Sequence, residues 1–366
     1  MKSISDLLSE FDPHLPLERA YTIPASWYCD PTFAECERMS VFSGWQPVAR
    51  LDQVSKPGSF VTADVAGEPV VVIRDGEGTL RAFHNVCRHR AALLLTEPCG
   101  TATKIRCRYH GWTYDLAGRL RGAPEFDGVC DFDHGANGLV PLTIATSLNM
   151  VWVCADTAGG PIEAVLSPLP ERIKKQVSSL HWVGRREYEL ECNWKVYVDN
   201  YLDGGYHVNT VHPELAGILD YAKYRTDLFE NSCVQLSPLV FDERLGNVRA
   251  GQMAQYWWVF PNFMLNLYDG VMDTNLVLPM GPERCRVVFD FYFAGQGEEF
   301  ITDSIEVAER VQKEDMQICA EVQRGLRSRA FNTGRYSVRR EAGVHLFHRL
   351  LAARLKTSNA SGKTDR

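Results

Sequence analysis

Two Cys–His pairs in one stretch of the chain have the residue types and the spacing of metal ligands. Cys87 and His89 are two residues apart, Cys107 and His110 are three apart, and seventeen residues separate the pairs. Two thiolates and two imidazoles are the ligand set of a Rieske [2Fe–2S] centre, in which the cysteines hold one iron and the histidines the other. Because neutral imidazoles replace two anionic thiolates, such a cluster has a raised reduction potential and passes single electrons onward.

The same four residues also match the ligand count of a structural Cys₂His₂ zinc site. However, Cys-x-His followed by Cys-x-x-His is not the zinc-finger order, and Gly111-Trp112 continues the Rieske pattern after the last ligand. We therefore interpret Cys87, His89, Cys107 and His110 as ligands of a Rieske cluster. A zinc site predicts a colourless protein, whereas a Rieske cluster predicts a brown one.

Two further histidines, His207 and His212, are candidate ligands of a second metal. On an ideal helix they would point about 140° apart, so they can share one ion only where the helix is distorted or ends between them. Pro213 disfavours helical geometry at the residue before it, which makes such an end reasonable. Two histidines and one carboxylate hold mononuclear non-haem Fe(II) and leave positions for O₂ and substrate. An electron-relaying cluster needs an acceptor of this kind.

Asp315, in a predicted C-terminal helix, is the candidate carboxylate ligand. The alternative is that Glu314 and Asp315 form a solvated acidic pair on a charged helix face, and spacing alone favours this alternative. His345 and His348 compete with the first histidine pair, but their spacing beside apolar residues is more typical of a packed helix end. The residues alone leave the third ligand open.

The elements that surround the two Cys–His pairs are predicted to be short strands, separated by turn signals such as Asp75-Gly76-Glu77-Gly78. The predicted strands cover 45–49, 60–65, 69–74, 80–83, 113–115, 140–143 and 149–154. This pattern predicts an antiparallel β Rieske domain over residues 40–156 with the cluster at one edge. The stretch 157–161 is a natural boundary.

The longer catalytic region, 157–356, is predicted to contain an antiparallel sheet flanked by helices, so the fold class is α+β. Predicted helices cover 167–179, 193–211 and 299–327, and predicted strands cover 188–191, 254–260, 263–267, 274–279 and 286–293. Residues 1–39 contain short predicted helices at 4–10 and 32–38 and are expected to pack on the catalytic domain. The polar tail 357–366 is expected to be disordered.

The composition is that of a globular protein with room for two cores. The 366 residues are 45% hydrophobic, with a net charge of −7 and no basic run, which argues against nucleic acid and anionic membranes as partners. No stretch approaches the roughly 20 apolar residues of a membrane span, and the first residues lack a targeting signal. The eleven cysteines are scattered, and an iron–sulfur cluster needs free thiolates, so we expect a reducing, cytoplasmic location.

Several longer stretches are similar to a known family. They are residues 193–195, 199–208, 261–264, 272–279 and 322–326. Together with the four cluster ligands, they resemble the Rieske non-haem iron oxygenases, the α subunits of ring-hydroxylating type. The resemblance covers residues 45–348, and within the family it is strongest to the quaternary-ammonium oxygenases related to choline monooxygenase. It implies an iron triad of His207, His212 and Asp315. The resemblance therefore favours Asp315 as a metal ligand over the solvated acidic pair.

The resemblance also implies a homotrimer in which electrons pass from one subunit's cluster to its neighbour's iron through a carboxylate. In the family that carboxylate lies three residues before the first iron histidine, and this position is Gly204 here. Asp203, four residues before His207 and on the same helix face, is therefore the candidate bridge, with Asp199 or a residue elsewhere as the alternatives. Asn200 matches an asparagine near the iron in the family.

The implied substrate is a small quaternary ammonium compound, with choline as the first candidate and betaine aldehyde as its product. Hydroxylation of an N-methyl carbon would instead release formaldehyde. A quaternary ammonium has no N–H to donate, so aromatic faces are expected to bind it. The candidate residues are Tyr256, Trp258 and Phe260 on one face of a predicted strand, Tyr268, and Asp269 as a counter-charge. The alternative for the aromatic run is an ordinary core strand.

Other functions use the same residues. An aromatic-ring hydroxylase or an O- or N-demethylase would use the same iron, and a Rieske electron-transfer protein would lack oxygenase activity. The sequence has neither a dinucleotide fingerprint nor a flavin signature. NAD(P)H is therefore expected to act indirectly, through a separate reductase and with or without a ferredoxin.

Overall fold

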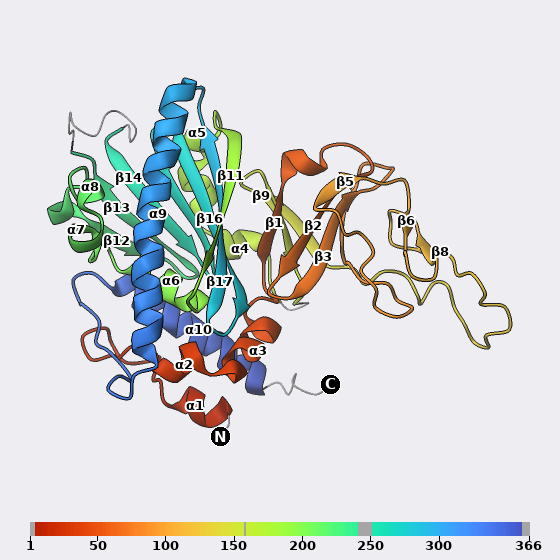
Figure 1. Cartoon of the computed structure of the whole chain (residues 1–366), viewed down its shortest axis with the longest axis horizontal. Coiled ribbons are helices and arrows are strands. Elements are labelled where there is room, and N and C mark those ends of the chain that lie inside the picture. The colour runs from red at the N-terminus through yellow and green to blue at the C-terminus, as the bar shows by residue number, and fades with distance from the viewer. Residues whose placement is uncertain (1–3, 157–158, 241–250, 361–366) are drawn as a thin grey trace. The chain divides into compact units, whose positions relative to one another are not determined.

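The computed structural model describes residues 4–156, 159–240 and 251–360 (Figure 1). The chain forms two compact units: Phe42–Ile162 is one, and Met1–Val41 together with Glu163–Arg366 is the other. The expected domain starts at residues 40 and 157 are slightly earlier than the observed starts at 42 and 163, and residues 157 and 158 lie outside the described part of the chain. The fold class is α+β, as predicted.

The smaller unit consists of short antiparallel strands, as the turn signals predicted. One sheet contains β1 (Gln46–Arg50), β10 (Met150–Cys154) and β9 (Thr143–Ser147), in that order. A second contains β4 (Leu80–His84), β3 (Glu68–Arg74), β2 (Ser59–Val65) and β5 (Cys99–Thr101). A third contains β6 (Ile105–Arg106), β7 (Thr113–Tyr114) and β8 (Leu120–Gly122). A 3₁₀ turn, η1 (Leu51–Val54), follows β1.

The core of this unit extends to the predicted cluster ligands. Val71 and Ile73 of β3 point to the same face of their sheet and pack with Phe60 of β2, which is paired directly with Ile73. Cys87 and Cys107 belong to the same apolar cluster, and each is only 3% exposed. The cysteine ends of both ligand loops are therefore anchored in the core.

The larger unit contains a seven-stranded antiparallel sheet in the order β11-β17-β16-β15-β14-β13-β12. The strands are β11 (His181–Leu190), β12 (Arg225–Leu228), β13 (Ser232–Pro238), β14 (Met253–Val259), β15 (Phe263–Tyr268), β16 (Val271–Gly281) and β17 (Arg284–Phe293). Figure 1 shows the long helix α9 (Glu298–Leu326) running across this sheet. The α9 helix also contacts α6 (Trp194–Leu202), which itself packs on β16 and β17.

The remaining helices of this unit are short, except the last. They are α1 (Ile4–Ser9), α2 (Ala25–Cys29), α3 (Pro31–Ser40), α4 (Ile162–Leu166), α5 (Leu169–Val177), α7 (Val208–Val211), α8 (Pro213–Ala216), η2 (Tyr221–Lys223) and α10 (Ala342–Ala360). The α10 helix contacts α1, α3 and α6, so the first part of the chain packs within the larger unit. No helix among the described residues is both long and apolar enough to cross a membrane.

The predicted helix 193–211 is wrong as a continuous element. It ends at Leu202 because Gly204 and Gly205 both have φ of +70°, a left-handed conformation that glycine adopts without steric cost. The short helix α7 follows only after this break. The expected disorder from residue 357 is also wrong in part, because α10 continues to Ala360; residues 361–366 lie outside the described part of the chain.

Candidate metal centres and active site

The four predicted cluster ligands lie on two loops of the smaller unit that share one backbone pattern. In the first loop the Cys87 carbonyl accepts a hydrogen bond from Ala91 N, and in the second the Cys107 carbonyl accepts one from Gly111 N. Ala91 and Gly111 both have positive φ, 54° and 76°. Each loop therefore forms a tight turn that begins at its cysteine. The histidine ligand of the same loop lies within this turn.

The histidine rings of the two loops lie beside each other. The ring centroids of His89 and His110 are 4.6 Å apart, and His89 stacks on Trp112 at 5.0 Å. Burial, followed by the nearby His110 and Arg90, lowers the pKa of His89, which keeps its imidazole in the neutral form that binds metals. Its Nδ1 atom is buried without a hydrogen-bond partner. A donor set of two thiols and two imidazoles with an orphaned ring nitrogen fits a Rieske cluster.

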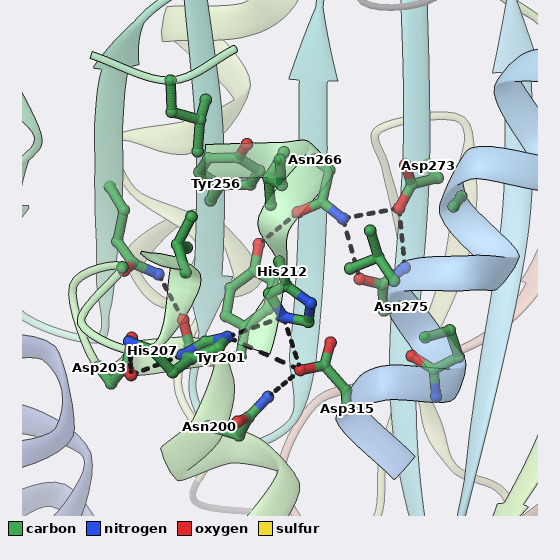
Figure 2. A pocket seen from close by; sticks show the side chains of 18 of the residues that line it. Asn200, Tyr201, Asp203, His207, His212, Tyr256, Asn266, Asp273, Asn275 and Asp315 are labelled. Atoms are coloured by element: carbon green, nitrogen blue, oxygen red, sulfur yellow. Dashed lines mark hydrogen bonds and ion pairs between the residues drawn. The ribbon is translucent and has the colours of Figure 1, made fainter. Parts of the chain in front are cut away.

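In the larger unit, one group of side chains has the geometry of a single-ion site. His207 Nε2 and His212 Nε2 are 3.0 Å apart, and Asp315 Oδ1 lies 3.0 Å from His212 Nε2 and 3.7 Å from His207 Nε2 (Figure 2). Among the described residues, only these three bring ligand atoms of this kind within 4.8 Å of one another. The three side chains are therefore close enough to bind one ion. Asp315, which spacing alone left open as the third ligand, lies where such a ligand must be.

The local backbone explains how histidines five residues apart face the same point. His207 is the residue before α7 and His212 is the residue after it. His212 has φ of −117° and ψ of 74°, outside the helical region, as expected for a residue that precedes proline. Asp315 approaches from the middle of α9. The helix end between the histidines, predicted from Pro213, is therefore present.

Each histidine is oriented by a second carboxylate. His207 Nδ1 lies 2.6 Å from Asp203 Oδ2, and His212 Nδ1 lies 2.7 Å from Glu314 Oε2. A ring that donates its Nδ1–H to a carboxylate presents the lone pair of Nε2 to a metal. Burial lowers the pKa of His212, but the hydrogen bonds to Asp315 and Glu314 outweigh burial and raise it overall, which indicates a negative local field that favours a cation.

Asn200 and Asp203 both lie beside the triad. Asn200 Nδ2 donates to Asp315 Oδ1 at 2.7 Å, and Asp203 also accepts from the backbone N of Tyr206 and of His207. Asp199, the alternative bridge, accepts from Tyr28 and His348 instead.

The rival histidine pair is part of a buried packing network. His348 is fully buried and lies 2.6 Å from the Tyr336 hydroxyl and 2.9 Å from Asp199 Oδ1. Its neighbour His345 is also buried, at 8% exposure. Both are on α10, as the packed-helix interpretation expected.

The triad opens into a pocket of about 780 Å³, a volume that includes the part open to solvent. The predicted substrate residues Tyr256 and Tyr268 line it, and their hydroxyls are 2.9 Å apart. The other pocket tyrosines are Tyr197, Tyr201 and Tyr224.

Three of the predicted substrate residues do not line this pocket, so the prediction is wrong for them. Trp258 is completely buried, with its ring against Phe347 of α10. Phe260 lies beyond the end of β14. Asp269 is exposed in the turn between β15 and β16. Of the three residues predicted on one face of this strand, only Tyr256 lines the pocket, because alternation along a strand does not show where a pocket ends.

Sequence reasoning missed two sets of residues. Glu314 was considered only as part of a solvated pair, although it orients His212. Asn266, Asp273 and Asn275 line the pocket from β15 and β16 and were given no role. The available signal was the run of three polar residues between apolar neighbours, Met272-Asp-Thr-Asn-Leu276.

Comparison with known proteins identifies both units. Residues 44–133 match the model of the Rieske [2Fe-2S] domain, and residues 177–233 and 241–357 match that of the ring hydroxylating alpha subunit (catalytic domain). Choline monooxygenase from Arabidopsis thaliana is 42% identical over 97% of this chain and 88% of its own length. The chain belongs to the Rieske oxygenases with a ring-hydroxylating alpha-subunit catalytic domain.

Other relatives agree with this assignment. The carnitine monooxygenase oxygenase subunit of Escherichia coli (strain K12) is 30% identical over 92% of this chain and 94% of its own length. A solved quaternary ammonium Rieske monooxygenase, 29% identical, matches 96% of this chain and 99% of that chain with a TM-score of 0.83. Naphthalene 1,2-dioxygenase, at 17% identity, shares the fold over 96% of each chain with a TM-score of 0.77.

Family membership settles the cofactor class. The oxygenase uses a Rieske [2Fe–2S] cluster, mononuclear non-haem Fe(II) and O₂ as co-substrate. The zinc-site and electron-transfer-only alternatives are therefore wrong. The donor sets in the two units suit these two groups: two thiols and two imidazoles in the smaller unit, and two imidazoles and a carboxylate in the larger one.

Proposed function

We propose that this oxygenase hydroxylates a small quaternary ammonium compound, and that choline is its substrate and betaine aldehyde its product. The observation that carries the proposal is that the candidate iron triad and five tyrosines share one pocket. Quaternary ammonium groups have no N–H and are recognised by the faces of aromatic rings. The relatives named for choline and carnitine monooxygenation support the same substrate class.

The charge of the pocket favours choline over a zwitterion such as carnitine. Besides Asp315, whose charge a bound Fe(II) offsets, Asp203 and Asp273 contribute carboxylates to the pocket lining. A substrate carboxylate would enter among like charges, which is unfavourable in a partly desolvated site. Choline carries a neutral hydroxyl in the corresponding place, so it avoids this repulsion.

The proposed reaction is the insertion of one oxygen atom into a carbinol C–H bond. The other oxygen atom leaves as water after two electrons and two protons have been supplied, and the resulting gem-diol loses water to give the aldehyde. Iron supplies O₂ activation when it is bound by His207, His212 and Asp315. Asp203 and Glu314 keep the two imidazoles in the ligating tautomer, and Asn200 fixes the Asp315 carboxylate.

The proposal includes an assembly in which Asp203 is the bridge for electrons. Asp203 contacts the Nδ1 side of His207 and is 15% exposed, so it connects the candidate iron site to the surface. The related solved monooxygenase is described as giving insight into inter-subunit electron transfer. We accordingly propose a homotrimer that receives electrons from NAD(P)H through a separate reductase, with or without a ferredoxin, in the cytoplasm.

The test is a single turnover of the chemically reduced, iron-loaded oxygenase with O₂. Choline, carnitine, glycine betaine and a simple arene are supplied separately, and each product is identified by mass. Betaine aldehyde from choline is the expected result. Formaldehyde would indicate oxidation of an N-methyl carbon instead, and product from the arene alone would overturn the substrate class.

A further inference from the structure

A row of polar side chains crosses the pocket-facing side of the large sheet. Gln235, Tyr256, Asn266 and Asp273 are directly paired neighbours on β13, β14, β15 and β16, so their side chains share one face. All four line the pocket. Burying polar groups in the middle of a sheet is unfavourable unless they are hydrogen-bonded, and such groups are retained where they serve a site.

Asp273 is the charged member of this row, and two amides hold it in place. Its side chain is buried at 3% exposure, and its Oδ2 atom accepts hydrogen bonds from Asn266 Nδ2 at 2.8 Å and Asn275 Nδ2 at 2.9 Å (Figure 2). Asn266 Nδ2 is also 3.2 Å from Asn275 Oδ1. Two N–H groups that donate to one carboxylate oxygen favour its ionised form.

The side chain of Asn266 is itself oriented by a hydrogen bond from a residue of α6. The Tyr201 hydroxyl of α6 lies 2.8 Å from Asn266 Oδ1, which directs the amide nitrogen of Asn266 toward Asp273. Burial raises the pKa of Tyr201 far above its ordinary value, and the negative charge of Asp273 raises it further. Tyr201 therefore remains a neutral phenol, and the field of Asp273 extends to this wall of the pocket.

We propose that Asp273 is the counter-charge for the ammonium head of the substrate, and that Asn266 and Asn275 position its carboxylate. This inference rests on the proposed function and adds the residue that selects for charge. Asp273 lies on the sheet wall of the pocket, whereas the iron triad comes from α9 and the segment around α7. An ammonium head against the sheet leaves the carbinol end of choline for the iron. The tyrosine rings contribute the remaining attraction.

Asp273→Asn removes the charge and keeps the shape. The carbonyl oxygen of the new amide can accept both N–H groups that Asp273 Oδ2 accepts now, so these two hydrogen bonds can form in the variant. Asp269→Asn is the matched control. It makes the same charge change four residues earlier, at an exposed turn outside the pocket.

The experiment measures equilibrium binding of two ligands to the oxidised holoenzyme, which has no electrons for turnover. Choline is compared with 3,3-dimethylbutan-1-ol, which has the same shape with carbon in place of the charged nitrogen. We expect Asp273→Asn to weaken choline binding by about tenfold or more, as for a desolvated charge pair. The neutral alcohol should bind the variant and the wild type alike, and Asp269→Asn should change neither affinity.

Unchanged choline binding in Asp273→Asn, or equal losses for both ligands, would overturn the proposal. Iron content and the cluster spectrum show whether the variant retains both metals. The wild type provides a readout that needs no variant, because it should bind choline about tenfold or more tightly than the alcohol, and equal affinities would overturn the proposal. The proposed function has its own test: if the wild type oxidises choline while Asp273→Asn binds it normally, only the role of Asp273 fails.

Discussion

At the scale of single residues, the candidate iron site depends on carboxylates that do not contact the metal position themselves. Asp203 and Glu314 each accept a hydrogen bond from one histidine ring, and these contacts fix which nitrogen faces the metal position. Asn200 Nδ2 donates a hydrogen bond to Asp315 Oδ1 and so fixes the orientation of that carboxylate. Loss of such supporting groups typically lowers metal affinity or activity by about 10- to 100-fold.

His207→Ala should remove the mononuclear iron and leave the Rieske cluster intact, because the two sites share no ligand. Metal analysis and the visible spectrum measure the two losses separately. His181→Ala removes an exposed imidazole from β11 and should change neither. Full activity in His207→Ala would exclude His207 from the site.

Asp203→Asn should leave both metals bound and slow reoxidation of the reduced cluster by about tenfold or more. The amide oxygen can still accept from His207, but the charge that we propose connects the centres is lost. Stopped-flow absorbance with substrate and O₂ gives the rate. Asp199→Asn should have little effect on it, since Asp199 contacts His348 and Tyr28 instead of the triad. A normal rate in Asp203→Asn would assign the bridge elsewhere.

At the scale of elements, the break after α6 decides the geometry of the site. Apolar spacing predicts one helix through residue 211, but the backbone reverses at Gly204 and Gly205. A Cβ at Gly204 would lie 2.1 Å from the Arg340 carbonyl oxygen. The reason for the glycine is therefore far away in the sequence, and local pattern cannot show it. The same close approach explains why a carboxylate side chain does not fit at position 204.

Gly204→Ala should destabilise the larger unit by about 2 kcal/mol or more, because left-handed backbone strain alone costs about 1–3 kcal/mol and the Arg340 carbonyl must also move. Thermal unfolding and mononuclear iron content measure the effect. Gly325→Ala in α9 has open space around it and should be neutral or stabilising by up to about 1 kcal/mol. Equal melting temperatures for Gly204→Ala and the wild type would contradict the structure.

The start of α6 is held by a buried ion pair with α3. Lys195 is completely buried, its Nζ lies 2.6 Å from Glu37 Oε1, and Trp194 Nε1 donates to Glu37 Oε2 at 2.7 Å. Lys195→Met leaves the Glu37 charge buried alone and should cost about 3–5 kcal/mol. The double change Lys195→Met with Glu37→Gln should recover most of this loss in thermal unfolding. No recovery would show that the lysine acts mainly by packing.

At the scale of the whole molecule, the two units have separate cores and separate metal chemistry. Cys107→Ser should abolish the cluster, the brown colour and turnover, while the larger unit stays folded and keeps its iron. Circular dichroism and metal analysis test this. Cys99→Ser, at an exposed cysteine of β5, is the control and should retain the cluster. Product formed with NADH and a reductase by Cys107→Ser would contradict the role of Cys107.

Much of this arrangement could be predicted from the sequence, and the limits are physical. Strand alternation and turn residues predict the α+β class, and the Cys–His spacing predicts a Rieske cluster, because these signals are local. Asp315 needed the family resemblance, since its partners are more than 100 positions away in the chain. Asp273 was missed because the pairing that brings it beside Asn266 is a property of the sheet.

The larger unit is discontinuous in the chain, and this has a consequence for synthesis on the ribosome. Residues 1–41 belong to it, yet their partners in α9 and α10 are translated only after the whole Rieske unit. At roughly 5–20 residues per second, everything after residue 162 takes roughly 10–40 s to emerge. During that time Trp27 and Phe33, fully buried in the finished protein, have no completed core to enter. The buried apolar residues of this segment therefore stay uncovered on the nascent chain until the rest of the larger unit has been made, which makes the segment a natural client for a ribosome-associated chaperone.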